Sequence, residues 1–267
     1  MEYQTFTNGV KIPMLGFGTY EIPSDTVGPL IQDALDTGYR HFDCAHLYGN
    51  EKAIGEALTK SNVARKDLFI TSKVWNTDQG YDKTLKAFQQ SLDDLQQDYL
   101  DLYLIHWPDA KNFQLTLDTW KALEKIYADG KARAIGVSNF SEDQLTELAK
   151  TATVKPMVNQ IERHPYKVQK ALGDFDAAHQ IVNEGYSPLG HGHAMLNDPV
   201  LVDLAAKYHK TAAQVVLRWD IDTNFVVFPK SSKPERIKEN FDIFDFKLEP
   251  ADIDRINALD QDKHLNY

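Results

Sequence analysis

Residues 41–51 read HFDCAHLYGNE, a short apolar strand pattern that passes through a Gly-Asn turn into a helix pattern. Gly49 and Asn50 supply the turn former and the helix cap that such a connection needs. The connection needs neither Asp43 at the end of the strand nor the phenol of Tyr48 beside the turn. The stretch is one strand–helix unit, and the needs of the connection do not explain its polar residues. Whether they have a function can be judged only from the rest of the sequence.

The same unit recurs along the whole sequence. Short apolar runs occupy residues 15–19, 41–45, 68–74, 100–106, 132–138, 156–162, 181–187 and 224–230. Amphipathic helix patterns occupy residues 25–36, 51–60, 81–96, 116–129, 141–150, 168–179, 198–208, 211–221, 234–239 and 250–259. Eight such units, at roughly 33 residues each, predict a (β/α)₈ TIM barrel that forms a single domain over residues 1–267.

Both ends of the chain carry an addition to the barrel pattern. An Asn8-Gly9 pair between short alternating runs predicts an N-terminal β-hairpin, and residues 250–259 predict an extra C-terminal helix. An open doubly wound sheet is the alternative fold. Its phosphate-binding fingerprint is missing, however, because Glu21 stands where the third glycine after Gly16 and Gly18 belongs.

Composition limits the possible partners and locations. The formal charge of −10 argues against nucleic acid or an anionic membrane as a partner. The single cysteine, Cys44, excludes an intrachain disulfide. The N-terminus lacks the apolar core of a signal peptide, and no apolar run approaches the roughly 18–20 residues of a membrane span. We expect a soluble cytoplasmic protein that is a monomer.

Polar residues stand at the ends of seven of the eight predicted strands. Active sites of TIM barrels form at these carboxyl ends, so the side chains are expected to converge. They are Asp43, Lys73, His106, Ser138 with Asn139, Gln160, Tyr186 with Ser187, and Lys230 with Ser231.

Tyr48 and three of these residues, Asp43, Lys73 and His106, suggest proton transfer to a carbonyl. A tyrosine has an unperturbed pKa of ~10, and a lysine ammonium beside Tyr48 would lower that pKa by favouring the phenolate. Asp43 can hold Lys73 charged, and His106 can offer a second donor to the same substrate oxygen. Neither a G-x-S-x-G elbow nor an H-E-x-x-H motif is present, so we expect a cofactor to supply the reductant.

A phosphate site is predicted in residues 229–240, PKSSKPERIKEN. Lys230, Ser231 and Arg236 place two cations and a hydroxyl around a helix start, which suits a phosphate group. The alternative, a solvated helix with scattered charges, is less attractive in so acidic a chain.

The sequence resembles the aldo-keto reductase family over nearly its whole length. The motifs GFGTY, FDCAHLYGNE, TSKVWN, LDLYLIHWP, GVSNF, VNQIE, GYSPLG and PKSSKPERIKEN occur in the family's order. Among its members the chain is most similar to short bacterial reductases of the 2,5-diketo-D-gluconate and glyoxal type. The resemblance implies an NADPH-dependent carbonyl reductase with Asp43, Tyr48, Lys73 and His106 as its catalytic tetrad, in which Tyr48 is the general acid.

The resemblance also assigns the binding residues. For the nicotinamide it implies stacking on Tyr186 and hydrogen bonds from Ser138, Asn139 and Gln160. For the rest of NADPH it implies Ser187 and Leu189 over the pyrophosphate, Lys230, Ser231 and Arg236 at the 2′-phosphate, and Ser232, Glu239 and Asn240 near the adenine. Tyr20, Trp75 and Trp107 would wall the substrate pocket beside His106.

The chain departs from the family pattern at several points. Cys44-Ala45-His46 follows the catalytic aspartate, Gly185 replaces the usual alanine before Tyr186, and the C-terminus is short. The short tail and the short loop GHGHAMLND imply an open pocket without a long cofactor clamp. Within that loop, His191 and His193 lack the third ligand that a metal site requires, so we predict no metal site.

Two other functions fit parts of the pattern. One is a non-catalytic cofactor-binding regulatory protein on the same barrel, which would not need all four tetrad residues. The other is a barrel enzyme of another reaction class, such as a phosphosugar isomerase, which would need carboxylate bases at the strand ends. Among carbonyl substrates, keto acids or diketo sugars, 2-oxoaldehydes and keto esters remain open.

Overall fold

The computed structural model describes residues 1–190 and 194–264. Within them, eight parallel strands form one sheet in which neighbours in sequence are neighbours in space. The strands are β3 (Phe17–Gly18), β4 (His41–Asp43), β5 (Phe69–Val74), β6 (Leu102–Ile105), β7 (Ile135–Ser138), β8 (Val158–Glu162), β9 (Val182–Tyr186) and β10 (Phe225–Val227). All eight predicted apolar runs contain a strand.

The first and last strands meet and close the sheet into a barrel. Leu15 pairs in parallel with Val227, and the amide of Gly18 donates a 3.2 Å hydrogen bond to the carbonyl of Pro229. A Cβ atom on Gly18 would lie 2.6 Å from the carbonyl oxygen of Phe228, so only glycine allows this approach. The predicted (β/α)₈ barrel is confirmed, and the open sheet is excluded.

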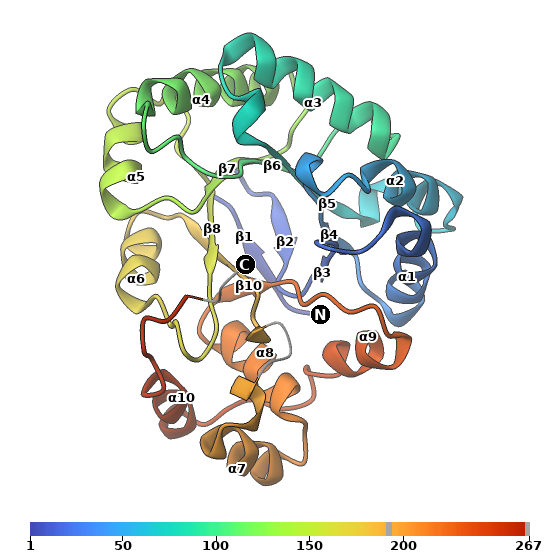
Figure 1. Cartoon of the computed structure of the whole chain (residues 1–267), viewed down its shortest axis with the longest axis vertical. Helices are drawn as coiled ribbons and strands as arrows, with labels where there is room; N and C mark the ends of the chain where they lie inside the picture. The colour runs from blue at the N-terminus through green and yellow to red at the C-terminus, as the bar shows by residue number, and fades with distance from the viewer. Residues whose placement is uncertain (191–193, 265–267) are drawn as a thin grey trace.

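Helices surround the barrel, as the view in Figure 1 shows. The α-helices are α1 (Ser24–Thr37), α2 (Glu51–Lys60), α3 (Tyr81–Leu95), α4 (Phe113–Ala128), α5 (Glu142–Ala149), α6 (Lys170–Ala178), α7 (Pro199–Tyr208), α8 (Ala212–Asp222), α9 (Pro234–Phe241) and α10 (Pro250–Asn257). Short 3₁₀ turns are η1 (His46–Tyr48), η2 (Arg65–Asp67), η3 (Asn76–Asp78) and η5 (Ala194–Asn197). The apolar sides of the α-helices pack against the sheet and against one another in two clusters of buried residues.

Local signals set several helix starts. Ser141 and Gln144 form a capping box before α5, and Thr211 and Gln214 form a second one before α8. Asp198 accepts from the amide of Val200 at the start of α7. Each cap satisfies amide groups that the first helical turn leaves without partners.

The predicted hairpin consists of β1 (Tyr3–Thr5) and β2 (Lys11–Pro13), which pair antiparallel. Its turn includes Gly9, which has a φ of 86°, a value that glycine adopts without strain. Phe6 and Ile12 join a buried cluster with Leu102, Leu104 and other strand residues. The hairpin therefore packs onto the barrel, and α10 confirms the predicted extra C-terminal helix. None of the helices in the described ranges has the length and apolar character of a membrane span.

Candidate active site

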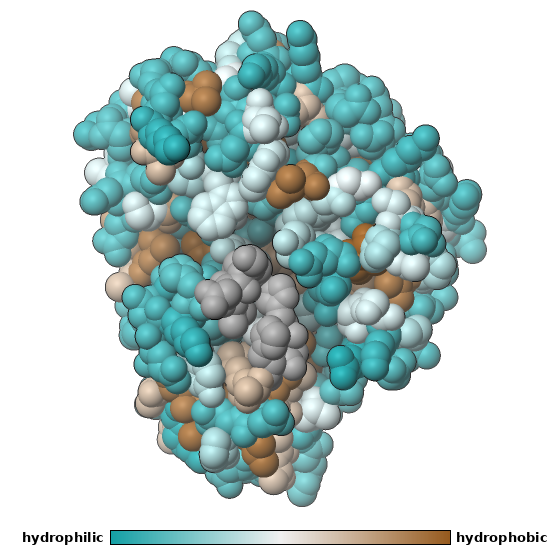
Figure 2. Space-filling view, in the orientation of Figure 1, coloured by the Kyte–Doolittle hydropathy of each residue, from teal (hydrophilic) through white to brown (hydrophobic). Residues whose placement is uncertain are grey.

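A large cleft with a volume of about 730 Å³ lies at the carboxyl ends of the strands. Figure 2 shows a largely hydrophilic surface on the side of the molecule seen in Figure 1, with hydrophobic residues in small separate groups. No broad apolar face therefore competes with the cleft as a candidate site among the described residues on this side. The predicted site residues in its walls are Tyr20, Asp43, Tyr48, Trp75, His106, Trp107, Ser138, Asn139, Gln160, Tyr186, Ser187, Leu189, Lys230, Ser231, Ser232, Arg236, Glu239 and Asn240.

Lys73 is the one predicted site residue in the described ranges that does not line the cleft. Its ammonium is fully buried and donates to both carboxylate oxygens of Asp43 at 2.8 Å and to the carbonyl of Cys44 at 3.0 Å. Burial opposes the charged form, but the negative charge of Asp43, the charge interaction with Tyr48 and the hydrogen bond to Asp43 together outweigh it, so the pKa of Lys73 is raised above its usual value. Lys73 and Asp43 therefore form a buried charged pair at the cleft floor, in which only Asp43 lines the cleft.

Tyr48 lies between this pair and the open cleft. It ends η1, where the left-handed Gly49 (φ 67°) turns the chain into α2. The Asn50 amide donates to the carbonyls of Thr19 and Ile22 at 2.9 and 3.0 Å, which ties this turn to the end of β3. The Lys73 nitrogen lies 5.3 Å from the centre of the Tyr48 ring.

The net pKa of Tyr48 differs from the expectation. Burial raises the pKa of Tyr48 to about 12, and the charge of Lys73 lowers it only in part while Asp43 raises it. The predicted direction of the lysine effect is right, but the predicted net lowering is wrong because the loss of hydration is the larger effect. Tyr48 is thus a phenol, with the ammonium in place to stabilise a phenolate once the proton has left.

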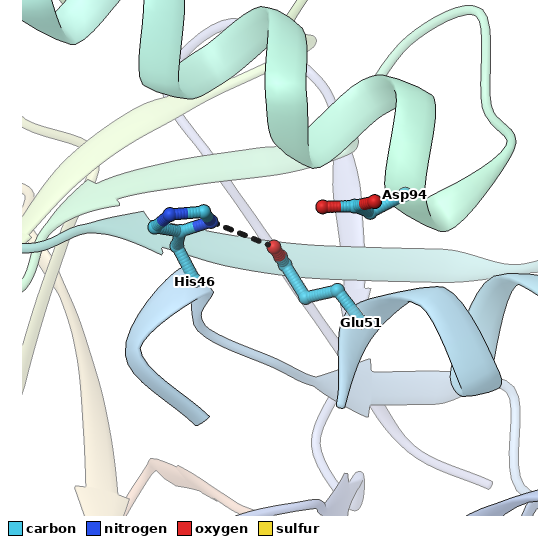
Figure 3. Close-up of side chains that lie close together, drawn as sticks. All are labelled: His46, Glu51 and Asp94. Carbon is cyan, nitrogen blue, oxygen red and sulfur yellow. Dashed lines mark ion pairs between the residues drawn. The ribbon is translucent and has the colours of Figure 1, made fainter. Parts of the chain in front are cut away.

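An ion pair fixes the turn that carries Tyr48. His46 Nδ1 lies 3.4 Å from a carboxylate oxygen of Glu51 at the start of α2, as Figure 3 shows. The buried Glu51 also accepts hydrogen bonds from Ser72 on β5 and Ser91 on α3, at 2.5 and 3.0 Å. Asp94 of α3 lies nearby. The oxygens of Glu51 are therefore committed to holding η1, α2 and α3 together.

His106 faces Tyr48 from the end of β6. Its ring centre lies 5.8 Å from that of Tyr48 and 5.0 Å from that of Trp75. Burial and, to a lesser degree, the charge of Lys73 lower its pKa to about 2, so the imidazole is neutral. The buried Nδ1 has no partner among the described residues, and a neutral ring can offer one N–H donor to a ligand.

The ends of β7, β8 and β9 form another part of the cleft wall. Ser138 donates to the carbonyl of Gln160 at 2.8 Å. Asn139, with φ 63°, donates to the His106 carbonyl and accepts from the Tyr186 hydroxyl at 2.8 Å. The left-handed backbone of Asn139 is sterically unfavourable for most residues. It places this amide where it fixes the Tyr186 ring.

The other end of the cleft carries positive charge. Lys230, Lys233 and Arg236 line it around the start of α9, and none of the three forms an ion pair with any described residue. Ser231 is nearly buried, and its hydroxyl accepts from the Lys233 amide at 3.1 Å. In a chain with a net charge of −10, three unpaired cations suit an anionic ligand group.

Aromatic and aliphatic side chains rim the end of the cleft that holds Tyr48. Tyr20 lies 5.0 Å from the Tyr48 ring, and Trp107 is 43% exposed at the mouth. Leu47, 45% exposed, lines the same end and was missed in the sequence. The feature of the sequence that could have indicated Leu47 is its position as an apolar residue between two polar ones, His46 and Tyr48. His191 and His193 lie outside the described residues.

The comparisons with known proteins identify the family of the chain and agree with its fold. Residues 14–261 match the model of the aldo/keto reductase family. Glyoxal reductase of Bacillus subtilis (strain 168) is 50% identical over 259 residues, covering 97% of this chain and 92% of the relative. An aldo-keto reductase from a Medee basin deep-sea metagenome library superposes with a TM-score of 0.96 at 41% identity, over 99% of this chain and 97% of its own.

A second solved structure is a mutant of Gox0644 in complex with NADPH. It has a TM-score of 0.92 at 39% identity and covers 97% of this chain and 93% of its own. Family model, relatives and fold all agree over nearly the full length of the sequence. The chain therefore belongs to the aldo/keto reductase family of oxidoreductases.

Proposed function

We propose that this chain is an NADPH-dependent carbonyl reductase in which Tyr48 protonates the carbonyl oxygen of an aldehyde or ketone. The observation that carries the proposal is the layout of one cleft. A buried Asp43–Lys73 pair lies beneath a tyrosine at one end, and cations without an ion-pair partner among the described residues lie at the other. The names of similar proteins support it, since one is a glyoxal reductase and another was solved with NADPH.

The residues present fit a nicotinamide dinucleotide phosphate. Lys230, Ser231 and Arg236 would hold the 2′-phosphate, with Ser232, Glu239 and Asn240 beside the adenine. Ser187 and Leu189 would cover the pyrophosphate. Ser138, Asn139, Gln160 and Tyr186 would bind the nicotinamide end. When bound, such a cofactor supplies a hydride to the carbonyl carbon.

The protein's own residues handle the proton. With a pKa of about 12, Tyr48 keeps its proton at neutral pH, so it can donate as negative charge develops on the substrate oxygen. Lys73 then stabilises the phenolate left behind, and Asp43 keeps Lys73 charged and in place. The neutral His106 ring donates a hydrogen bond to the same oxygen and orients the carbonyl.

The substrate class follows from the cleft and the relatives. The aromatic rim of Tyr20, Trp75 and Trp107 suits a compact carbonyl compound with an apolar face. A 2-oxoaldehyde is the first class to test because the similar Bacillus protein is named a glyoxal reductase. Keto acids, diketo sugars and keto esters are the further classes. A monomeric, cytoplasmic enzyme is part of this proposal.

Replacing Tyr48 with phenylalanine tests the proton-donor role. Tyr48→Phe is expected to lower kcat by about 10²–10⁴-fold, the usual contribution of a general acid, while NADPH affinity stays within about twofold. Tyr103→Phe is the matched control because it removes a buried hydroxyl that has no partner among the described residues and lies outside the cleft. If Tyr48→Phe kept most of its turnover, Tyr48 would not be the proton donor.

A further inference from the structure

A second carboxyl group lies inside the barrel, next to the catalytic pair. Glu184 on β9 is fully buried and does not line the cleft. It is the register partner of Gln160 on β8. The Gln160 Nε2 group donates to Glu184 Oε2 at 2.8 Å and to Asp43 Oδ1 at 3.0 Å. One amide thus connects Glu184 to the Asp43–Lys73 pair.

The charges around Glu184 do not balance if it is ionised. Asp43 faces it from β4, Lys73 from β5 and the neutral Gln160 from β8, whereas β10 (Phe225–Val227) brings no titratable side chain. One ammonium group would then serve two carboxylates in a closed apolar interior, which is strongly unfavourable. Glu184 Oε1 has no partner among the described residues, so this oxygen is the place for a proton.

We propose that Glu184 is a positioning residue that works as a neutral acid, holding Gln160 in place and keeping a second negative charge away from Asp43, Lys73 and Tyr48. The kinetic part of this proposal rests on the proposed carbonyl reduction. The structural part, a buried protonated Glu184 carboxyl that is hydrogen-bonded to Gln160, does not rest on that reaction.

The protonation state follows from the surroundings. Burial, and then the charge of Asp43, raise the pKa of Glu184 from its ordinary 4.5 to about 8. Because the folded pKa is raised, the stabilising effect of the proton is fully present below pH 4.5 and is lost as the pH rises towards 8. Around pH 8 the group begins to ionise in the folded protein.

Ionisation of Glu184 would disturb proton transfer. A new negative charge near Lys73 favours the ammonium and disfavours the Tyr48 phenolate, so Tyr48 becomes a weaker acid. It also strengthens the hydrogen bond that Gln160 donates to Glu184 on β9. Because Tyr48 itself has a pKa of about 12, we expect the ionisation of Glu184, and not that of Tyr48, to lower activity near pH 8.

Glu184→Gln is the decisive variant because glutamine has the shape of the neutral acid and can still accept from Gln160. Asp176→Asn is the matched control. Asp176 is also buried, accepts from Asn159 and has a pKa raised by burial to about 7, but among the described residues no hydrogen bond connects it to Gln160, Asp43 or Lys73. A third variant, Glu184→Met, removes the acceptor altogether.

Three measurements are made on each protein between pH 5 and 9: thermal unfolding, NADPH affinity, and kcat/KM with a 2-oxoaldehyde. Wild type should lose activity by up to about tenfold between pH 7 and 9, as expected for one group with a pKa near 8. Glu184→Gln should show no such loss and should gain thermal stability relative to wild type as the pH rises from 5 to 8. Asp176→Asn should change only the thermal stability. Glu184→Met should bind NADPH more weakly than Glu184→Gln.

The outcomes distinguish a failure of the Glu184 proposal from a failure of the proposed carbonyl reduction. If wild type reduced no carbonyl, the unfolding and NADPH-binding measurements would still test Glu184. An alkaline limb that persists in Glu184→Gln, or equal stabilities of this variant and wild type at every pH, would overturn the proposal. So would the same flattening of the kinetic profile in Asp176→Asn, because it would show a general effect of removing buried carboxyls.

Discussion

Replacement of Arg236 should separate NADPH from NADH binding. Arg236 lies on α9, lines the cationic end of the cleft and has no ion-pair partner among the described residues. NADPH and NADH differ only in the 2′-phosphate, so the loss of a guanidinium that holds this phosphate affects NADPH alone. We therefore predict that Arg236→Ala weakens NADPH binding and leaves NADH binding unchanged.

The size of the effect follows from the exposure of the site. A hydrogen bond to a charged group contributes about 1.5–3 kcal/mol, which corresponds to roughly 10–150-fold in Kd. Arg236 is exposed, so salt screens the pair and the lower end of this range applies at physiological ionic strength. We expect NADPH affinity to fall about 10–30-fold at physiological ionic strength, more at low salt and less at high salt.

Quenching of tryptophan fluorescence during titration with each cofactor is a suitable assay. Lys238→Ala is the matched control because Lys238 is an exposed cation on the same helix that does not line the cleft. It should leave both affinities unchanged. Equal weakening of NADPH and NADH by Arg236→Ala, or an equal loss in the Lys238 control, would refute the phosphate assignment.

Two further replacements probe the other parts of the cleft. Trp107→Ala removes an exposed aromatic wall, so it should raise KM for an aromatic aldehyde about 3–10-fold and leave the unfolding temperature unchanged; an unchanged KM would remove Trp107 from the substrate wall. Asn139→Ala places alanine at a φ of 63° and removes the hydrogen bond to Tyr186. It should therefore weaken NADPH and NADH alike by about tenfold or more in fluorescence titrations, and a loss confined to NADPH would show that Asn139 does not act at the nicotinamide end.

Sequence periodicity was sufficient to predict the barrel because the strands are buried on both faces and read as apolar runs. It was less reliable at element ends. The first barrel strand, β3, covers only Phe17–Gly18 of the predicted residues 15–19. Leu15 joins Val227 through an isolated bridge, and the Thr19 amide donates to the carbonyl of Asp43. Helix α4 begins at Phe113, before the predicted residue 116, and Phe113 packs 6.2 Å from the Phe140 ring. Such tertiary contacts leave no mark on a local pattern.

The site residues were predictable because their polar side chains interrupt apolar runs. The net effect of burial and charge on their pKa values was not predictable from the sequence. Lys73 was expected to lower the pKa of Tyr48, but whether burial outweighs that charge depends on how many atoms surround the ring, which a sequence does not state. Glu184 was missed for a similar reason. It looks like an ordinary strand carboxylate until the register places it beside Gln160.

The measurement that tests the account most directly is NADPH oxidation by the purified protein with aldehydes, diketones and keto acids, with NADH in parallel. We predict turnover with NADPH, most rapid with 2-oxoaldehydes, and much weaker turnover with NADH at the same concentration. Tight NADPH binding without turnover on any carbonyl would contradict the account. It would instead support a cofactor-binding regulatory protein on this barrel.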